Sequence, residues 1–118
     1  MEKRAVYKGK SVVGLVEDVT VFGKNKGKKL RARIDTGATK SSIDKDLVKE
    51  LGIGPVIGKR WVKSAHGTTL RPVVKIKIKL SKRKMNYKFT IADRKHMRYK
   101  ILIGQNILQK HFLIDPSK

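Results

Sequence analysis

Residues 33–39 read Arg-Ile-Asp-Thr-Gly-Ala-Thr. Just before Asp35, residues 30–34 alternate apolar residues with arginines, which predicts a half-buried strand. Asp35 therefore stands on a tight turn at the end of that strand, where Gly37 permits a left-handed or closely approached backbone. A carboxylate held on such a turn suits proton transfer to and from a water molecule. Asp-Thr-Gly also forms ordinary turns, so this stretch alone leaves both interpretations open.

A second stretch, residues 101–106, reads Ile-Leu-Ile-Gly-Gln-Asn. The first stretch has Asp-Thr-Gly-Ala at residues 35–38, and much later the second has two apolar residues before Gly104. This pair of motifs, in this order, resembles the pattern of the retropepsin-like aspartic proteases. In that family the later element crosses behind the catalytic turn and leads into a short helix. The resemblance therefore implies that Asp35 is the catalytic acid and that Gly104 packs behind it.

Motifs in the last third of the chain resemble one small family within the retropepsin-like proteases. Residues 71–74 (Arg-Pro-Val-Val), 92–94 (Ala-Asp-Arg) with Met97 close behind, and 112–116 (Phe-Leu-Ile-Asp-Pro) occur in the order of a small retropepsin-like family labelled ATP-dependent zinc proteases, the RimB-like proteins. Members occur near ligases that add glutamates to proteins, and some trim oligo-glutamate. The resemblance implies one aspartic protease domain over residues 1–118.

The pattern of short strands predicts an all-β fold, a small closed retropepsin-like barrel with one or two short helices. Residues 11–22 are rich in valine and predict one long or bent strand. Asp44 is placed to cap a helix that ends at Gly52. Residues 59–65 and 68–80 predict two strands joined at His66-Gly67, where the resembling proteins carry the flap over the cleft.

The resemblance assigns residues to the site. Asp35, Thr36 and Gly37 form the catalytic turn, in which Thr36 would hydrogen-bond across a two-fold axis. The chain holds one Asp-Thr-Gly, whereas an aspartic protease needs two adjacent carboxylates that share a proton. A second copy must therefore supply the other Asp35, which predicts a C2 homodimer. The candidate substrate-binding residues are Ala38, Thr39, Lys40, Ala65, His66, Gly67, Arg71 and Gly104.

Two positions depart from the retroviral pattern. Those enzymes have Asp where this chain has Thr39, and an Arg that pairs with it where this chain has Gln105. Because both charges are absent together, a neutral hydrogen bond can replace the ion pair. The change leaves open how substrate backbone near Thr39 is held.

The sequence predicts no metal and no cofactor. It has no cysteine, no His-Glu-x-x-His motif, and its three histidines, His66, His96 and His111, are scattered. There is no Gly-rich phosphate-binding loop ending in Lys-Ser or Lys-Thr, so the ATP and zinc of the family label find no motif here. With no apolar run near the ~20 residues of a membrane span, we expect a cytoplasmic protein without membrane contact.

The net charge is +21, from 30 Lys and Arg against 9 Asp and Glu. Such a charge attracts polyanions, so the leading interpretation is a peptidase for acidic or glutamate-rich peptides, with non-specific nucleic acid binding as a by-product. The alternative is a basic RNA- or ribosome-associated binding module that kept the fold without catalysis, using Trp61, Tyr87 and Phe89 to stack on bases. The charge is also compatible with a solvated lysine-rich surface that has no role in binding.

Overall fold

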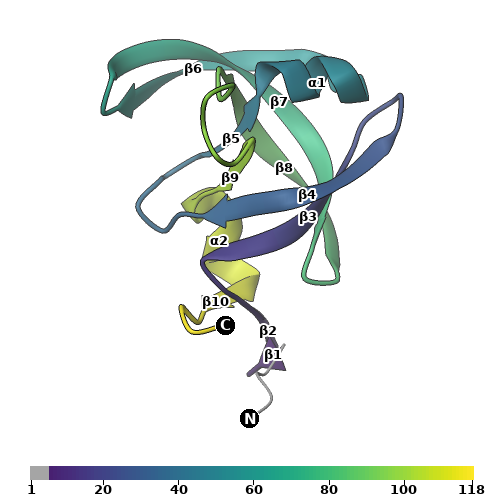
Figure 1. Ribbon diagram of the computed structural model, residues 1–118, viewed down its shortest axis with the longest axis vertical. Helices are drawn as coiled ribbons and strands as arrows, with labels where there is room; N and C mark the ends of the chain where they lie inside the picture. The colour runs from purple at the N-terminus through teal and green to yellow at the C-terminus, as the bar shows by residue number, and fades with distance from the viewer. Residues whose placement is uncertain (1–5) are drawn as a thin grey trace.

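The computed structural model of the protein describes residues 6–118, and within them it contains ten strands and two short helices (Figure 1). In chain order they are β1 (Val6–Tyr7), β2 (Lys10–Val13), β3 (Val16–Phe22), β4 (Gly27–Ile34), β5 (Ser41–Asp44), α1 (Lys45–Leu51), β6 (Val56–Ser64), β7 (Gly67–Leu80), β8 (Arg83–Ala92), β9 (Ile101–Ile103), α2 (Gln105–His111) and β10 (Phe112–Ile114). No helix in these residues is long and apolar enough to cross a membrane.

Six strands close into a barrel in the order β3–β4–β9–β5–β8–β7. The ring closes because β3 pairs antiparallel with β7 as well as with β4, for example at Val21 opposite Ile78. Closure leaves these six strands without a free edge. The prediction of an all-β, closed retropepsin-like barrel with two short helices is confirmed.

The flap is the hairpin formed by β6 and the first half of β7. β6 continues the sheet beyond β7 and lies outside the ring, with Trp61 opposite Leu70 and Ser64 opposite Gly67. Gly67 has φ 109°, which explains why a glycine ends the turn there. Figure 1 shows the flap projecting past the barrel on the same side as the loop between β4 and β5.

Of the one long or bent strand predicted over residues 11–22, the bend is confirmed, but the segment forms two strands in different sheets. The chain bends at Gly14, whose N–H donates to the Glu17 carboxylate at 2.8 Å. β2 before the bend joins β1 and β10 in a separate three-stranded sheet, whereas β3 after it belongs to the barrel. Valine content shows that both segments favour extended backbone, but it does not show where the chain changes sheets.

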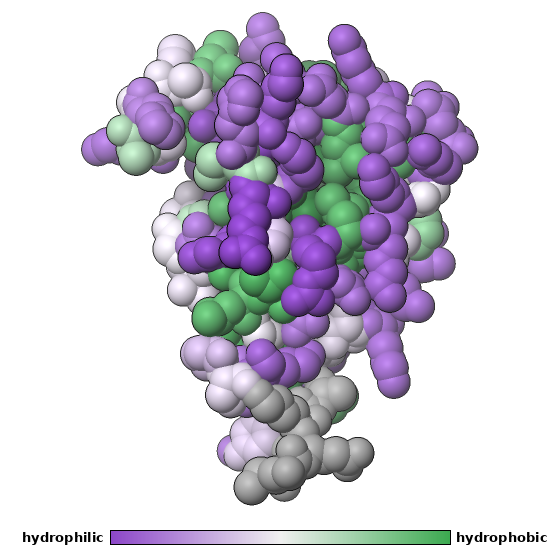
Figure 2. Space-filling model, in the orientation of Figure 1, coloured by the Kyte–Doolittle hydropathy of each residue, from purple (hydrophilic) through white to green (hydrophobic). Residues whose placement is uncertain are grey.

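The alternation along β7 behaves as its period of two requires. Ile76, Ile78 and Leu80 are buried in the barrel core, while the intervening lysines Lys75, Lys77 and Lys79 are exposed on its outer face. In Figure 2 hydrophilic side chains likewise cover much of the visible face, with apolar surface between them. The lysine row is therefore a solvated strand face.

Helix α1 has the predicted caps. The Asp44 carboxylate accepts from the N–H of Asp46 at 3.2 Å, and Gly52 ends the helix with φ 68°. The other Asp44 oxygen accepts the N–H of Arg94 at 2.7 Å. A helix cap thus also fixes the loop between β8 and β9, which reaches the candidate site.

Candidate active site

Asp35 directly follows β4 and is held by the backbone around it. Its N–H donates to the carbonyl of Ile103 at 2.9 Å, and its carbonyl accepts the N–H of Ala38 at 3.3 Å. Its side-chain Oδ1 accepts the N–H of Gly37 at 2.9 Å. The carboxylate is half-buried, so it has one fixed oxygen and remains accessible to a ligand.

β9 lies between β4 and β5 in the sheet, which places Gly104 directly behind this turn. The N–H of Gly104 donates to the Ser41 hydroxyl at 2.9 Å, and the N–H of Gln105 donates to the Ala38 carbonyl at 2.8 Å. A Cβ on Gly104 would lie 2.9 Å from that carbonyl oxygen and closer still to the carbonyl of Lys40. Only glycine fits between the two segments without moving backbone.

Gln105 occupies the position of the retroviral arginine. Its side-chain amide donates to the carbonyl of Thr36 at 2.7 Å, so a neutral hydrogen bond takes the place of an ion pair, as the sequence suggested. The partner is the backbone of Thr36 rather than the side chain of Thr39. The side chain of Thr36 is left exposed at the tip of the turn.

A cleft of about 560 Å³ lies between the catalytic turn, the flap and the loop after β8. Six of the predicted substrate-binding and catalytic residues line it, namely Gly37, Ala38, Thr39, Lys40, His66 and Arg71. Ala65, Gly67 and Gly104 do not: the first two are exposed at the flap tip, and Gly104 is buried behind the turn. Thr36 is also outside the lining.

Asp35 faces an adjoining cavity of about 300 Å³, which we name the Asp35 pocket. Arg33, Arg98 and Tyr99 also line it. Its remaining lining residues, Arg94, Met97 and Leu102, line the cleft as well, so the two spaces share a wall. Three arginines, Arg33, Arg94 and Arg98, therefore line the cavity that Asp35 also lines.

Arg94 lines both cavities, and sequence reasoning did not include it among the site residues. It is only 9% exposed, its Nε donates to the carbonyl of Tyr99 at 2.9 Å, and its Nη1 lies 3.4 Å from the hydroxyl of Ser42. Burial, followed by the nearby charge of Arg71, lowers the pKa of Arg94, and the carboxylates of Asp44 and Asp35 oppose that shift. The Ala-Asp-Arg order marked the family, but nothing in it showed that the guanidinium turns inward.

Cations are the common feature of the cleft wall. They come from the catalytic turn, the flap, β7 and the loop after β8, and they are Lys40, Lys63, Arg71 and Arg94. Lys75, Lys77 and Lys79 line neither the cleft nor the Asp35 pocket. Attraction of an anionic ligand into the cleft would therefore come from these four groups and not from the lysine row of β7.

Among residues 6–118 no group of three or more His, Cys, Asp and Glu side chains could hold a metal ion. His66 lies at the flap tip and lines the cleft, while His96 and His111 lie on other elements. The side chains of the Asp35 pocket and of the cleft together offer carboxylate and cation chemistry, which fits proton transfer at Asp35 and binding of anions.

We expect Arg94→Gln to destabilise the fold, because it removes the charged hydrogen bond that the buried guanidinium donates to the carbonyl of Tyr99. The cost is about 1.5–3 kcal/mol, which lowers the thermal midpoint by roughly 6–12 °C. Lys95→Gln, at the next and exposed position, is the matched control, and calorimetry compares the two. Equal midpoints for both variants would contradict the structural role of Arg94.

The fold is similar to several solved structures. The protease of EIAV matches with a TM-score of 0.65 at 21% identity, over 80% of this chain and 84% of that one. The simian foamy virus protease matches with a TM-score of 0.58 at 20% identity, over 80% and 91%. A protein of unknown function from Legionella pneumophila matches with a TM-score of 0.61 at 20% identity, over 91% and 94%. At these identities the likeness establishes the fold.

Sequence comparison supplies the family. A segment of 64 residues, 53% of this chain, is 31% identical to a probable alpha-L-glutamate ligase from Desulfotalea psychrophila, but the chain spans only 14% of that protein. The model of the RimB-like family, described as retropepsin-like aspartic endopeptidase RimB, matches residues 45–118. These residues include Arg94 and Gly104 and begin after Asp35. Because the match covers more than half of the chain, the protein belongs to the RimB-like family of retropepsin-like aspartic endopeptidases.

Proposed function

We propose that residues 1–118 form one aspartic protease domain that hydrolyses peptide bonds as a homodimer, with one Asp35 from each copy in a shared site. The observation that carries the proposal is the Asp35 turn itself: one carboxylate, with one oxygen fixed by the Gly37 N–H, beside a cleft. A single carboxylate cannot act as acid and base at once. Two copies related by a two-fold axis supply both roles.

In such a pair the two Asp35 carboxyls share one proton, because like charges about 3 Å apart cannot both ionise. The ionised Asp35 takes a proton from a water molecule as the water attacks the scissile carbonyl carbon. The protonated Asp35 gives its proton to the carbonyl oxygen. As the C–N bond of the tetrahedral intermediate breaks, the proton taken from water passes to the departing amine nitrogen, and one hydroxyl of the intermediate returns its proton to the Asp35 pair. Thr36 is exposed in the single chain, and in the proposed pair it would contact the partner's turn.

The proposed substrate is an acidic peptide. The lining residues Lys40, Lys63, Arg71 and Arg94 give the cleft a positive field, and Asp93 is the one acidic side chain among the cleft residues. A cleft of one sign of charge concentrates ligands of the opposite sign, most strongly at low ionic strength. Because part of this chain is similar to a probable glutamate ligase, we propose glutamate-rich chains as the acidic substrate.

The test compares glutamate-rich, glutamine-rich and lysine-rich peptides of equal length at two salt concentrations, with products followed by mass spectrometry. We expect the glutamate-rich peptide to be cleaved fastest and its advantage to shrink as salt rises, because salt screens the cleft cations. Equal cleavage rates for all three peptides, unchanged by salt, would mean that the positive charge has no role in substrate selection. No cleavage of any peptide would contradict the peptidase proposal.

A dimer that depends on salt is a second expected result. Each copy carries +21, so two copies repel until counter-ions screen them within about 8 Å at physiological ionic strength. Analytical ultracentrifugation at micromolar concentration should show the dimer fraction rising with salt or with an added acidic peptide. A strict monomer under every condition, with peptidase activity retained, would rule out the shared site.

RNA binding without catalysis remains a second candidate function because of the flap. Trp61 is 66% exposed, next to Lys59, Arg60 and Lys63 on the same strand, and can stack on a base. Phe89 cannot, because it is fully buried. Tight binding of a single-stranded RNA that Trp61→Ala abolishes, without hydrolysis of any peptide, would favour this candidate. The absence of cysteine leads us to propose the reducing cytoplasm as the site of action for either function.

A further inference from the structure

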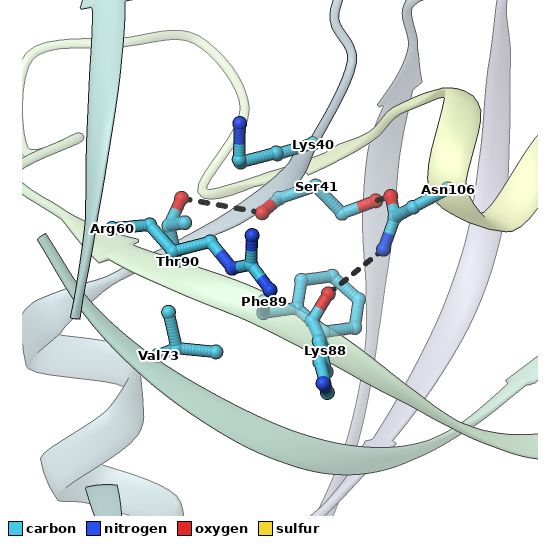
Figure 3. A pocket seen from close by; sticks show the side chains of 8 residues that line it. All are labelled: Lys40, Ser41, Arg60, Val73, Lys88, Phe89, Thr90 and Asn106. Carbon is cyan, nitrogen blue, oxygen red and sulfur yellow. Dashed lines mark hydrogen bonds between the residues drawn. The ribbon is translucent and has the colours of Figure 1, made fainter. Parts of the chain in front are cut away.

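A separate cavity of about 230 Å³, which we name the outer pocket, lies beside the cleft (Figure 3). It is lined by residues of β5, β6, β7, β8 and α2 together with Lys40. Lys40 and Thr90 line the cleft as well, so the two spaces share a wall. Small-molecule sites usually have volumes of about 300–1,000 Å³, and the outer pocket is closer to the size of one side chain.

The outer pocket has a fixed wall. The Ser41 hydroxyl donates to Asn106 Oδ1 at 2.6 Å, Asn106 Nδ2 donates to the Lys88 carbonyl at 2.9 Å, and Thr90 Oγ1 donates to the Ser41 carbonyl at 3.3 Å. Figure 3 shows this chain of hydrogen bonds along one side of the pocket. In these bonds the polar groups of the wall are hydrogen-bonded to each other, so the wall has its shape without a ligand.

The cations of the outer pocket, by contrast, have no acidic partner among the described residues. None of the ion pairs in residues 6–118 involves Lys40, Arg60 or Lys88. Figure 3 places the Arg60 guanidinium in the middle of the group, with the Lys40 ammonium on one side and that of Lys88 on the other. Unpaired cations around a space for one side chain attract a carboxylate, most strongly through the bidentate geometry of arginine.

We propose that the outer pocket binds the side-chain carboxylate of a second glutamate in an acidic peptide whose neighbouring residues occupy the cleft. The inference rests on the proposed function in one respect, that an acidic chain occupies the cleft. Lys40 lines both the cleft and the outer pocket. An extended peptide advances about 3.3–3.6 Å per residue, so a peptide of a few residues can reach from one space into the other. The pocket would therefore select longer acidic chains over short ones.

Carboxylate fits the outer pocket better than a nucleic acid backbone does. The aromatic residue that lines the pocket, Phe89, is fully buried, so its ring offers no face for a base to stack on. The wall is also continuous with the cleft that contains the candidate catalytic turn. Both observations favour an acidic peptide as the occupant.

The test measures binding in the Asp35→Asn background, which prevents turnover, with labelled octaglutamate, labelled triglutamate and an eight-nucleotide single-stranded RNA as probes. The pocket variant carries Arg60→Gln and Lys88→Gln. The control carries Lys77→Gln and Lys79→Gln, which remove the same charge from the outer face of β7 at positions opposite Asn86 and Lys84 and not opposite Lys88. Fluorescence anisotropy at a fixed salt concentration gives each Kd, and circular dichroism checks that both variants fold.

We expect the pocket variant to weaken octaglutamate binding about five- to tenfold and triglutamate binding less than twofold, with the control changing either by less than twofold. Equal losses in the control and the pocket variant would overturn the proposal, because the effect would then belong to the overall field. Equal losses for both peptide lengths would overturn it too. A larger loss for RNA than for octaglutamate would assign the pocket to nucleic acid. Because hydrolysis is not measured, failure of the peptidase proposal leaves this result interpretable.

Discussion

Asp35→Asn is expected to abolish peptide hydrolysis while the fold and the dimer persist. The amide has nearly the same shape as the carboxylate, and its oxygen can still accept the Gly37 N–H that now bonds Oδ1. It cannot take a proton from water, so both copies lose the general base. The expected loss of kcat is at least 10²- to 10⁴-fold, roughly the contribution of one positioned acid–base group.

The measurement is cleavage of a glutamate-rich peptide by mass spectrometry, with circular dichroism and sedimentation as checks on fold and assembly. Asp93→Asn is the matched control. Asp93 lines the cleft, is exposed, and has its pKa lowered chiefly by the N–H of Lys95, so it is an ionised acid away from the catalytic turn. If the Asp35 variant cleaves at the parental rate, or if both variants lose activity equally, Asp35 is not the catalyst.

Gly104→Ala is expected to damage both stability and activity. The added Cβ would meet the carbonyl oxygens of Lys40 and Ala38, which are backbone atoms and cannot rotate away. Overpacking of this kind costs about 1–3 kcal/mol, which lowers the thermal midpoint by roughly 4–12 °C. Because Ala38 follows the catalytic turn, the displaced backbone also moves the Asp35 carboxylate.

Gly58→Ala is the control for the glycine substitution. Gly58 lies on β6, a Cβ there would meet nothing within 4 Å, and its φ lies outside the left-handed region. Calorimetry and a cleavage assay on the two variants separate the effect of crowding from the general effect of losing a glycine. A Gly104 variant as stable and as active as the Gly58 variant would show that the segment behind the turn moves freely.

The barrel could be predicted because its elements carry local signals. Asp44 and Gly52 bound α1 as capping chemistry requires, and the alternation along β7 gives the buried and exposed faces correctly. The two family stretches, at Asp35 and Gly104, also lie side by side as their order suggested, joined by the bond from Asp35 N–H to Ile103. Where a few consecutive residues determine a structure, the sequence contains the information.

Other features depend on contacts between distant residues. The bend at Gly14 arises because β2 pairs with β10, a strand from the other end of the chain, instead of continuing into the barrel. The inward orientation of Arg94 depends on the Tyr99 carbonyl and Ser42, which only the folded loop brings together. Ala65 and Gly67, which the resemblance assigns to substrate binding, lie at the exposed flap tip outside the cleft lining, so their contact with substrate stays a prediction.

The central claim is a site made of two Asp35 carboxylates, and mixing the active protein with its Asp35→Asn variant tests it most directly. At constant total concentration, activity from a shared site follows the square of the active fraction, because only pairs of unmodified chains contain both groups. An equal mixture should therefore retain about a quarter of the activity of the unmodified protein. A retained activity of about one half, linear in the active fraction, would contradict the shared dyad and assign catalysis to a single chain.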